Sequence, residues 1–234
     1  MIKTDQEIFS KLWINQSKAI PGWWKNLLFY AYEEIDKFQT KESIEGNLGE
    51  IGIYHGRSLI PLSNFRKENE IMVCMENGKW TKGKEPYKQN LINVFGSLDG
   101  FEIYHESSEN SKKFHEYIPF RIFYIDGSHT YEMTLNDLRI AGEVINEKGI
   151  LFLDDYDNPK FGVPICKAVD KFLEENSEFR ISFTVGQSLF ICKQDMVESY
   201  NNCMANLKWI VSPDKKYSQV NHYIHPDGLD VFKK

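Results

Sequence analysis

The chain has 234 residues, of which 41 % are hydrophobic and 26 % are charged, and its formal net charge is −6. This length suits one sizeable α/β domain with short additions at its ends, and the composition disfavours an intrinsically disordered chain. The longest apolar runs, such as residues 150–153, are far too short to span a bilayer, so we expect no membrane association.

The charge balance also bears on nucleic acid as a partner. A protein that grips a phosphate backbone usually carries a basic face, because counterion release supplies much of the affinity. Four lysines cluster at Lys79, Lys82, Lys84 and Lys88, and we interpret them as one solvated loop face. We therefore expect no nucleic acid partner.

The amino-terminal residues and the cysteines indicate the compartment. The first seven residues lack the basic-then-apolar layout of a signal peptide, so we expect a cytoplasmic protein. No two of the four cysteines have CxxC spacing, which supports neither a zinc cluster nor a disulfide framework. Cys74 and Cys192 lie in apolar runs and are expected to be buried thiols.

The first segment, residues 1–42, is predicted to be a helical arm. Apolar residues recur at helical spacing over residues 26–38, and Pro21 and Gly22 break the chain just before them. Trp23 and Trp24 either pack this arm onto the main body or line a substrate entrance.

The second segment, residues 43–193, alternates short apolar strands with helices. Strands are predicted at residues 44–51, 71–75, 101–104, 121–125 and 150–153, and a helix at 130–147. This order implies parallel strands joined by right-handed crossovers. Residues 179–184 and 188–193 then form an antiparallel hairpin. We expect a doubly wound, mostly parallel seven-stranded α/β sheet ending in that hairpin, followed by a carboxyl-terminal extension, 194–234, of unassigned role.

A glycine-rich segment, residues 49–58, ends the first strand and opens a helix. Gly52 and Gly56 allow a sharp turn and close approach to a ligand. The spacing matches neither GxxxxGK[ST] nor GxGxxG. Glu50 would repel a pyrophosphate and attract a cationic amino group, although an ordinary tight turn explains the motif equally well. Glu76, after the second strand, is either a ribose ligand or an exposed turn residue.

Acidic residues follow two strands that we expect to be neighbours. Asp126 ends one apolar run, and Asp154 and Asp155 end the next. Adjacent strands lie about 4.8 Å apart, so these carboxylates converge and need a cation or a raised pKa. Mg²⁺ suits such oxygen ligands, and His129 is then a base for a hydroxyl proton. Alternatively, Asp126 and His129 cap the following helix and the paired aspartates are merely solvated.

A second metal pair is conceivable at His222 and His225, with Asp227 as the nearest acid. A tail without a metal is the simpler interpretation of these residues.

Three segments resemble the class I S-adenosylmethionine-dependent methyltransferases. They are E-I-G-x-x-H-G-R-S-L from Glu50, Y-I-D-G-S-H-T-Y-E from Tyr124, and G-I-L-F-L-D-D-Y from Gly149. The branch that they resemble includes macrocin-type sugar O-methyltransferases and cephalosporin-hydroxylase-like proteins. The resemblance spans about residues 43–193.

The resemblance implies a role for each motif residue. It implies that Glu50, Gly52, Tyr54 and Gly56, with Ser58 close by, surround the methionine part of the cofactor. It further implies that Glu76 binds the ribose and that Ser107 or Ser108 approaches the adenine. Asp126, Asp154 and Asp155 would hold the magnesium ion, and His129 would be the base. Two positions depart from the family pattern, since relatives often place Asp near Cys74 and Glu at Asp154. The first departure moves the expected ribose-binding acid by one or two positions, and the second, a shorter side chain, shifts the expected position of the metal.

The resemblance implies methyl transfer from S-adenosylmethionine to a hydroxyl of a small molecule, with a sugar as the preferred acceptor. A hydroxylase-like enzyme on the same fold and a binding protein without catalysis are the alternatives. A nicotinamide enzyme is disfavoured because GxGxxG is missing. The aromatic ends of the chain favour a homo-oligomer.

Overall fold

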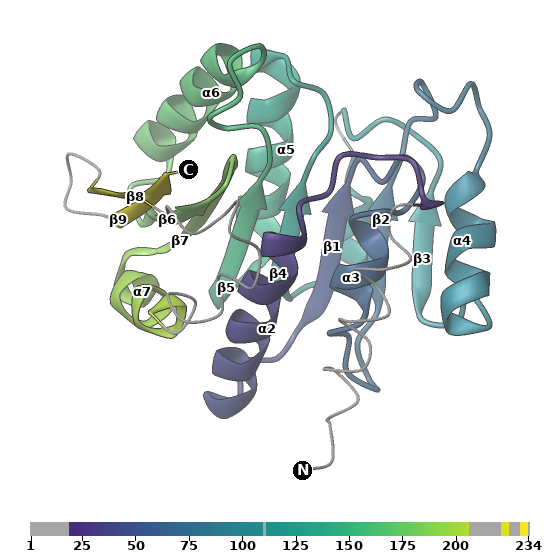
Figure 1. Cartoon of the computed structure of the whole chain (residues 1–234), viewed down its shortest axis with the longest axis horizontal. Helices are drawn as coiled ribbons and strands as arrows, with labels where there is room; N and C mark the ends of the chain where they lie inside the picture. Colours follow the sequence, from purple (N-terminus) through teal and green to yellow (C-terminus); the bar gives the residue numbers. More distant parts are fainter. Residues whose placement is uncertain (1–18, 110, 206–220, 225–229, 234) are drawn as a thin grey trace.

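The computed structural model describes residues 19–109, 111–205, 221–224 and 230–233. It has three layers, with one twisted sheet between two layers of helices (Figure 1). None of the described helices combines the length and the apolar composition needed to cross a bilayer. The helical prediction for the first 18 residues, and the histidine pair at 222 and 225, concern side chains outside the described residues.

The sheet contains the predicted seven strands and two more. In spatial order the strands are β3 (Phe101–Tyr104), β2 (Met72–Met75), β1 (Asn47–Ile51), β4 (Phe120–Ile125), β5 (Ile145–Leu153), β7 (Ser188–Lys193), β6 (Phe179–Val185), β9 (Asp230–Lys233) and β8 (Asn221–Ile224). Strands β1 to β5 are parallel, and β7 is antiparallel to both β5 and β6. The doubly wound, mostly parallel prediction is confirmed. The sheet does not end at the β6–β7 hairpin, because β9 pairs with β6 and β8 with β9.

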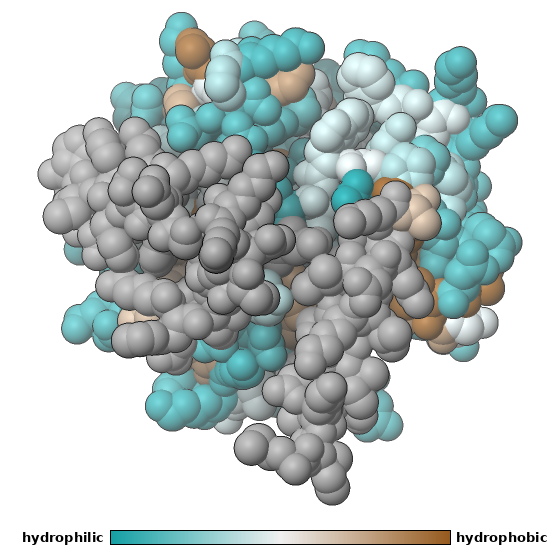
Figure 2. All heavy atoms as spheres, in the orientation of Figure 1, coloured by the Kyte–Doolittle hydropathy of each residue, from teal (hydrophilic) through white to brown (hydrophobic). Residues whose placement is uncertain are grey.

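Helices cover both faces of this sheet. They are α2 (Asn26–Lys41), α3 (Leu59–Ser63), α4 (Pro86–Phe95), α5 (Tyr131–Val144), α6 (Gly162–Glu175) and α7 (Val197–Met204). Because strand side chains alternate between faces, Tyr124 packs with α2 and α7 while Phe123 packs with α5 and α6. Figure 2 shows hydrophilic side chains over most of the described part of one face, with a hydrophobic area at its lower right.

Several predicted element boundaries differ from the structure, and two of the differences have a clear physical reason. The first strand begins at Asn47 rather than residue 44, because Ser43 and Gly46 have positive φ angles of 54° and 146° that no strand accommodates. The helix predicted over 130–147 ends at Val144, since Ile145 is extended and pairs with Phe120 as the first residue of β5. Ile145 therefore belongs to the sheet and not to the apolar stripe of the helix.

A buried ionic network fastens α2 to the sheet. The fully buried Arg121 of β4 pairs with Glu70 at 2.7 Å and with Asp36 of α2 at 3.0 Å, and it donates to Gln39 at 2.7 Å. A buried guanidinium needs such a complete set of partners. Cys74 and Cys192 are buried free thiols, as predicted.

Candidate active site

The carboxyl ends of β1, β4 and β5 bring the predicted motifs together. Ile51 is paired with Ile125, and Ile125 with Leu153. The next residues continue this register, because the Asp126 amide donates to Ile51 O at 2.8 Å and the Asp154 amide donates to Ile125 O at 2.9 Å. The glycine-rich turn and the acidic residues therefore share one edge of the sheet (Figure 1), where α/β folds place their ligands.

The turn after β1 depends on Gly52. Its φ is +87°, and a Cβ at this position would lie 2.0 Å from the backbone oxygen of Asp126. Only glycine permits both this conformation and this approach. Gly56 also has a positive φ, of 84°, and its amide closes the turn on Ile53 O at 2.6 Å. The two glycines therefore shape the turn, as the sequence predicted.

Glu76 holds this turn from the neighbouring strand. Its carboxylate accepts the backbone amides of Ile53 at 3.1 Å, Tyr54 at 2.8 Å and Gly78 at 2.8 Å. The side chain is buried, so it is not an exposed turn glutamate. The two roles predicted from the sequence were a ribose ligand and an exposed turn residue; its contacts add a structural role, which the motif spacing did not reveal.

Glu50 is fully buried behind the turn. One carboxylate oxygen, Oε1, accepts the hydroxyl of Ser58, and the other, Oε2, has no hydrogen-bond partner among the described residues. Burial raises the pKa of Glu50 well above its usual range, the Ser58 hydrogen bond opposes this, and the charges of Asp126 and Glu76 add to it. A buried, unpartnered acceptor is costly, so Glu50 is suited to meet a cationic or donor group of a ligand.

The segment before α2 covers this region. Arg57 donates to Gly22 O at 2.5 Å, and Trp23 stacks on Tyr54 with ring centroids 5.9 Å apart. Beneath lies a cavity of about 40 Å³, bounded by residues that include Gly52 and Asp126. Sites for drug-sized ligands measure roughly 300–1,000 Å³, so a nucleoside-sized molecule fits only if this segment shifts.

The two tryptophans divide the roles that the sequence left open. Trp24 is buried in the core, 5.4 Å from Tyr32 between ring centroids, and fastens the segment to the main body. Trp23 is 87 % exposed and lies over Tyr54 at the border of the cavity.

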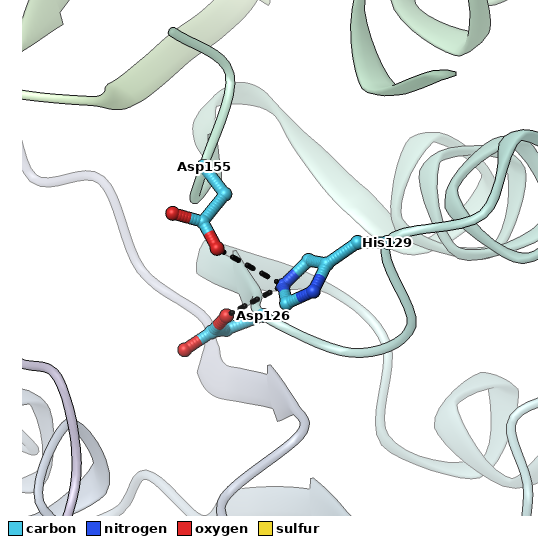
Figure 3. Close-up of side chains that lie close together, drawn as sticks. All are labelled: Asp126, His129 and Asp155. Atoms are coloured by element: carbon cyan, nitrogen blue, oxygen red, sulfur yellow. Dashed lines mark ion pairs between the residues drawn. The ribbon is translucent and has the colours of Figure 1, made fainter. Parts of the chain in front are cut away.

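Asp126, His129 and Asp155 form a compact polar group, which we call the acidic group (Figure 3). His129 Nε2 lies 3.6 Å from Asp126 Oδ1 and 3.2 Å from Asp155 Oδ2. One ligand atom from each residue lies within 4.8 Å of the others. The imidazole stacks on Phe161 at 4.6 Å between ring centroids, which fixes the plane of the ring.

The backbone of Asp155 aims its carboxylate into the group. Its φ is +58°, a left-handed conformation that aspartate tolerates better than most residues. Asn158 donates to Asp155 Oδ1 at 2.8 Å, leaving Oδ2 to face His129. The sequence analysis missed Asn158; its signal was an Asn three residues after an Asp in a turn.

Burial and neighbouring charges perturb the acidic group. Burial raises the pKa of Asp126 to about 7; the contact with His129 opposes this rise, and the charges of Asp154 and Asp155 reinforce it. The contact with Asp126 raises the pKa of His129 despite the burial of the ring, and the surrounding carboxylates add to the rise. The crowded carboxylates therefore favour a positively charged partner, either a protonated His129 or a bound cation.

Asp154, predicted as a third metal ligand, lies outside the acidic group. Its carboxylate accepts the hydroxyls of Tyr124 at 3.0 Å and Ser188 at 2.6 Å. Asp126 and Asp155 therefore lie together with His129. Asp154 instead accepts hydrogen bonds from two hydroxyl groups that were not identified from the sequence.

The serines after β3 differ from each other. Ser107 is exposed and accepts the amide of Glu109 at 3.2 Å. Ser108 is buried and donates to Asp137 of α5 at 2.6 Å. Burial raises the pKa of Asp137 to about 6, against hydrogen bonds from Ser108 and Asn136. Asp137 was not singled out from the sequence.

Comparisons with known proteins agree with this geometry. Residues 50–156 match a family described as a methyltransferase domain. The chain is 24 % identical over 158 residues to the uncharacterized protein R132 of Acanthamoeba polyphaga mimivirus, covering 64 % of this chain and 68 % of that protein.

Two solved structures share the fold. The O-methyltransferase NovP has a TM-score of 0.66 and 13 % identity, covering 81 % of this chain and 99 % of NovP. CalS11, a TDP-rhamnose 3'-O-methyltransferase of calicheamicin biosynthesis, has a TM-score of 0.54 and 14 % identity, covering 83 % and 96 %. The family match over residues 50–156 is consistent with the glycine-rich turn and the strand order, and the fold of the chain is that of the class I methyltransferases.

Proposed function

We propose that this protein transfers the methyl group of S-adenosylmethionine to a hydroxyl of a small molecule, and that the acceptor is a sugar. The acidic group beside the Gly52 turn carries the proposal, because methyl transfer to oxygen needs a hydroxyl that loses its proton next to the methyl donor. Both solved structures share the fold: the O-methyltransferase NovP supports transfer to oxygen, and CalS11, a TDP-rhamnose 3'-O-methyltransferase, supports a sugar as the acceptor.

Residues of the glycine-rich turn fit the methionine end of the cofactor. The unpartnered oxygen of Glu50 is buried behind Gly52 and suits a cationic amino group. S-Adenosylmethionine supplies an already activated methyl group, so the protein's task is mainly to align the acceptor oxygen. Access requires the segment from Pro21 to Trp24 to shift from its position over the turn.

The acidic group fits a divalent cation. Two carboxylate oxygens and one imidazole nitrogen within 4.8 Å are donors that Mg²⁺, Mn²⁺ or a related ion accepts. We propose Mg²⁺, held by Asp126 and Asp155. When bound, the ion lowers the pKa of a hydroxyl that coordinates it.

His129 can take one of two mutually exclusive roles in this site. Its Nε2 faces both carboxylates, and its single lone pair either coordinates a cation or receives the hydroxyl proton. We propose that Nε2 receives the proton, since Asp126 and Asp155 already supply charged ligands. The stacking of Phe161 on the ring restricts its orientation and supports this role.

Calorimetry tests the cofactor. S-Adenosylmethionine and S-adenosylhomocysteine are titrated into the full chain with and without Mg²⁺, and we expect both to bind. Absence of binding for either form contradicts the proposal. Methyl transfer to a panel of sugars and phenols then separates an enzyme from a protein that only binds the cofactor.

A His129→Ala variant tests the base. We expect turnover to fall by about 10²-fold or more, with Mn²⁺ and S-adenosylhomocysteine affinities unchanged. Loss of Mn²⁺ affinity instead makes His129 a ligand, and wild-type turnover excludes both roles. His115→Ala is the matched control, because His115 also faces a carboxylate, Glu143 at 2.9 Å, outside the site.

A further inference from the structure

The segment between β2 and α4, residues 77–85, carries a charge that the proposed site does not use. Lys79, Trp80, Lys82 and Lys84 are all exposed on it. We call this segment the basic loop. Trp80 is 78 % exposed, so its ring is available for stacking on a ligand.

Internal hydrogen bonds hold the basic loop in one conformation. The Thr81 hydroxyl donates to Lys84 O at 2.5 Å, and the Gly83 amide donates to Gly78 O at 2.9 Å. Lys82 adopts a left-handed φ of 55° within this turn. The cations therefore stand on a built turn, so less conformational entropy is lost when they engage a ligand.

The basic loop is joined to the glycine-rich turn by hydrogen bonds of one side chain. The carboxylate of Glu76 accepts the Gly78 amide at the start of the loop, and the same carboxylate accepts the amides of Ile53 and Tyr54. One side chain thus sets the position of both segments. A ligand on the basic loop would lie beside the glycine-rich turn, at the edge of the sheet where the acidic group stands.

The loop lysines are unneutralised. Within the described residues, Lys79, Lys82 and Lys84 form no ion pair, while Glu85, which follows Lys84 in the sequence, contacts Lys88 at 2.8 Å and His105 at 3.8 Å. Three such cations stand out on a chain of net charge −6. S-Adenosylmethionine carries one carboxylate beside its sulfonium and ammonium cations, too little negative charge for three lysines, so they point to a second, anionic ligand.

We propose that the basic loop binds the diphosphate of a nucleotide carried by the acceptor, with Trp80 stacked on the base. Lysines bind phosphates as point charges, and aromatic rings stack on any nucleobase. This inference rests on the proposed function and narrows its substrate class from a sugar to a nucleotide-activated sugar, whose hydroxyl reaches the acidic group.

Calorimetry on the full chain with three probes tests the inference. Uridine diphosphate carries base and phosphates, inorganic pyrophosphate carries the phosphates alone, and S-adenosylhomocysteine reports the cofactor site. Uridine avoids competition for the adenine position of the cofactor. We expect uridine diphosphate to bind the unmodified protein, and we expect its affinity to fall as salt rises.

Two loop variants separate charge from stacking. In the triple variant K79Q/K82Q/K84Q, we expect the affinities for uridine diphosphate and pyrophosphate to fall by at least about tenfold. In Trp80→Ala, we expect the affinity for uridine diphosphate to fall by about fivefold or more and that for pyrophosphate to stay unchanged. Both should bind S-adenosylhomocysteine as the unmodified protein does. The control K41Q/K148Q/K167Q makes the same charge change at exposed lysines outside the loop.

Each other outcome has a definite meaning. The inference is wrong if uridine diphosphate does not bind, or if it binds equally to the loop and control variants. In either case, binding of S-adenosylhomocysteine leaves the proposed function standing. A single-stranded RNA oligonucleotide that binds through the same lysines while uridine diphosphate does not also overturns the inference. Failure of S-adenosylhomocysteine to bind the unmodified protein overturns the proposed function itself.

Discussion

The glycine-rich turn and the acidic group lie at the same edge of the sheet, yet different forces hold them. The turn is close-packed: Gly52 leaves no space for a Cβ, and the Glu76 carboxylate accepts three amides around it. The acidic group is partly exposed, and its two carboxylates are held near each other despite their like charge.

This difference predicts opposite responses to substitution. Changes in the turn should cost folding stability, because steric fit and buried hydrogen bonds are lost. Changes in the acidic group should cost ligand binding while leaving stability nearly intact, because little of its arrangement is favourable without a ligand. Stability and binding measured on the same variants therefore test whether the two regions are separable.

Gly52→Ala is the largest expected effect. Its Cβ would meet the Asp126 backbone oxygen at 2.0 Å in a left-handed conformation, so we expect a loss of about 3 kcal/mol or more in unfolding free energy. Denaturant unfolding measures it. Gly96→Ala is the control, since Gly96 has a similar φ of +84° but open space around it; it should lose about 1–2 kcal/mol. Equal losses in both variants would show that backbone strain alone matters at Gly52.

Glu76→Gln tests the hydrogen bonds of the turn. Glutamine keeps one acceptor oxygen and turns an amide donor toward backbone amides that need acceptors. We expect a loss of about 1–3 kcal/mol in unfolding free energy. Glu102→Gln, at an exposed position on β3, should change little. If the Glu76 variant is as stable as this control, the Glu76 carboxylate does not stabilise the turn.

Asp137→Asn tests a buried acid under the turn after β4. The folded protein raises the pKa of Asp137 to about 6 from an ordinary 3.8, so between about pH 4 and 6 it retains a proton that the unfolded chain releases. Stability therefore falls as pH rises through this range, by about 2–3 kcal/mol in total.

The asparagine variant should lose this pH dependence and exceed the unmodified protein at pH 7.5 by about 1–3 kcal/mol. Its amide oxygen still accepts from Ser108. Urea unfolding at several pH values measures both effects, with the exposed Asp195→Asn as control. Parallel pH profiles for all three proteins would contradict the assignment.

Asp155→Asn should have the smallest effect on stability. Asparagine tolerates the left-handed φ of 58°, so unfolding free energy should stay within about 1 kcal/mol. Mn²⁺ affinity should fall about tenfold or more, because a charged ligand is lost. Titration followed by manganese electron paramagnetic resonance measures this. Asp157→Asn, exposed on the same loop, should bind Mn²⁺ normally; equal affinities in the two variants would place the ion elsewhere.

Much of the fold follows from local pattern. The patterns at 101–104 and 188–193 predicted strands whose bounds agree with the structure, because Phe101 and Ile103 flank a polar residue as in a half-buried strand and 188–193 has the consecutive apolar residues of a buried one. The boundary at Ile145 was missed since an apolar residue after a helical stripe suits either a last helical turn or a first strand residue. Pairing with Phe120 settled the choice, and that partner is distant in sequence.

The candidate site shows the same division. Its position followed from the sequence: parallel strands ending in Gly52, Asp126 and Asp155 must deliver these residues to one edge. The direction of each side chain did not. Asp154 and Asp155 are adjacent and chemically alike, yet Asp154 turns to Tyr124 and Ser188 while Asp155 turns to His129.

The sequence by itself determined the parallel sheet, the tight turn at Gly52 and the gathering of acids, because periodicity and residue size act over a few neighbouring positions. Only the tertiary structure decided which carboxylates meet His129, that Glu76 supports the turn, and that Trp24 enters the core while Trp23 remains outside. Those outcomes depend on partners tens of residues away, whose hydrogen bonds and packing exist only once the strands are side by side.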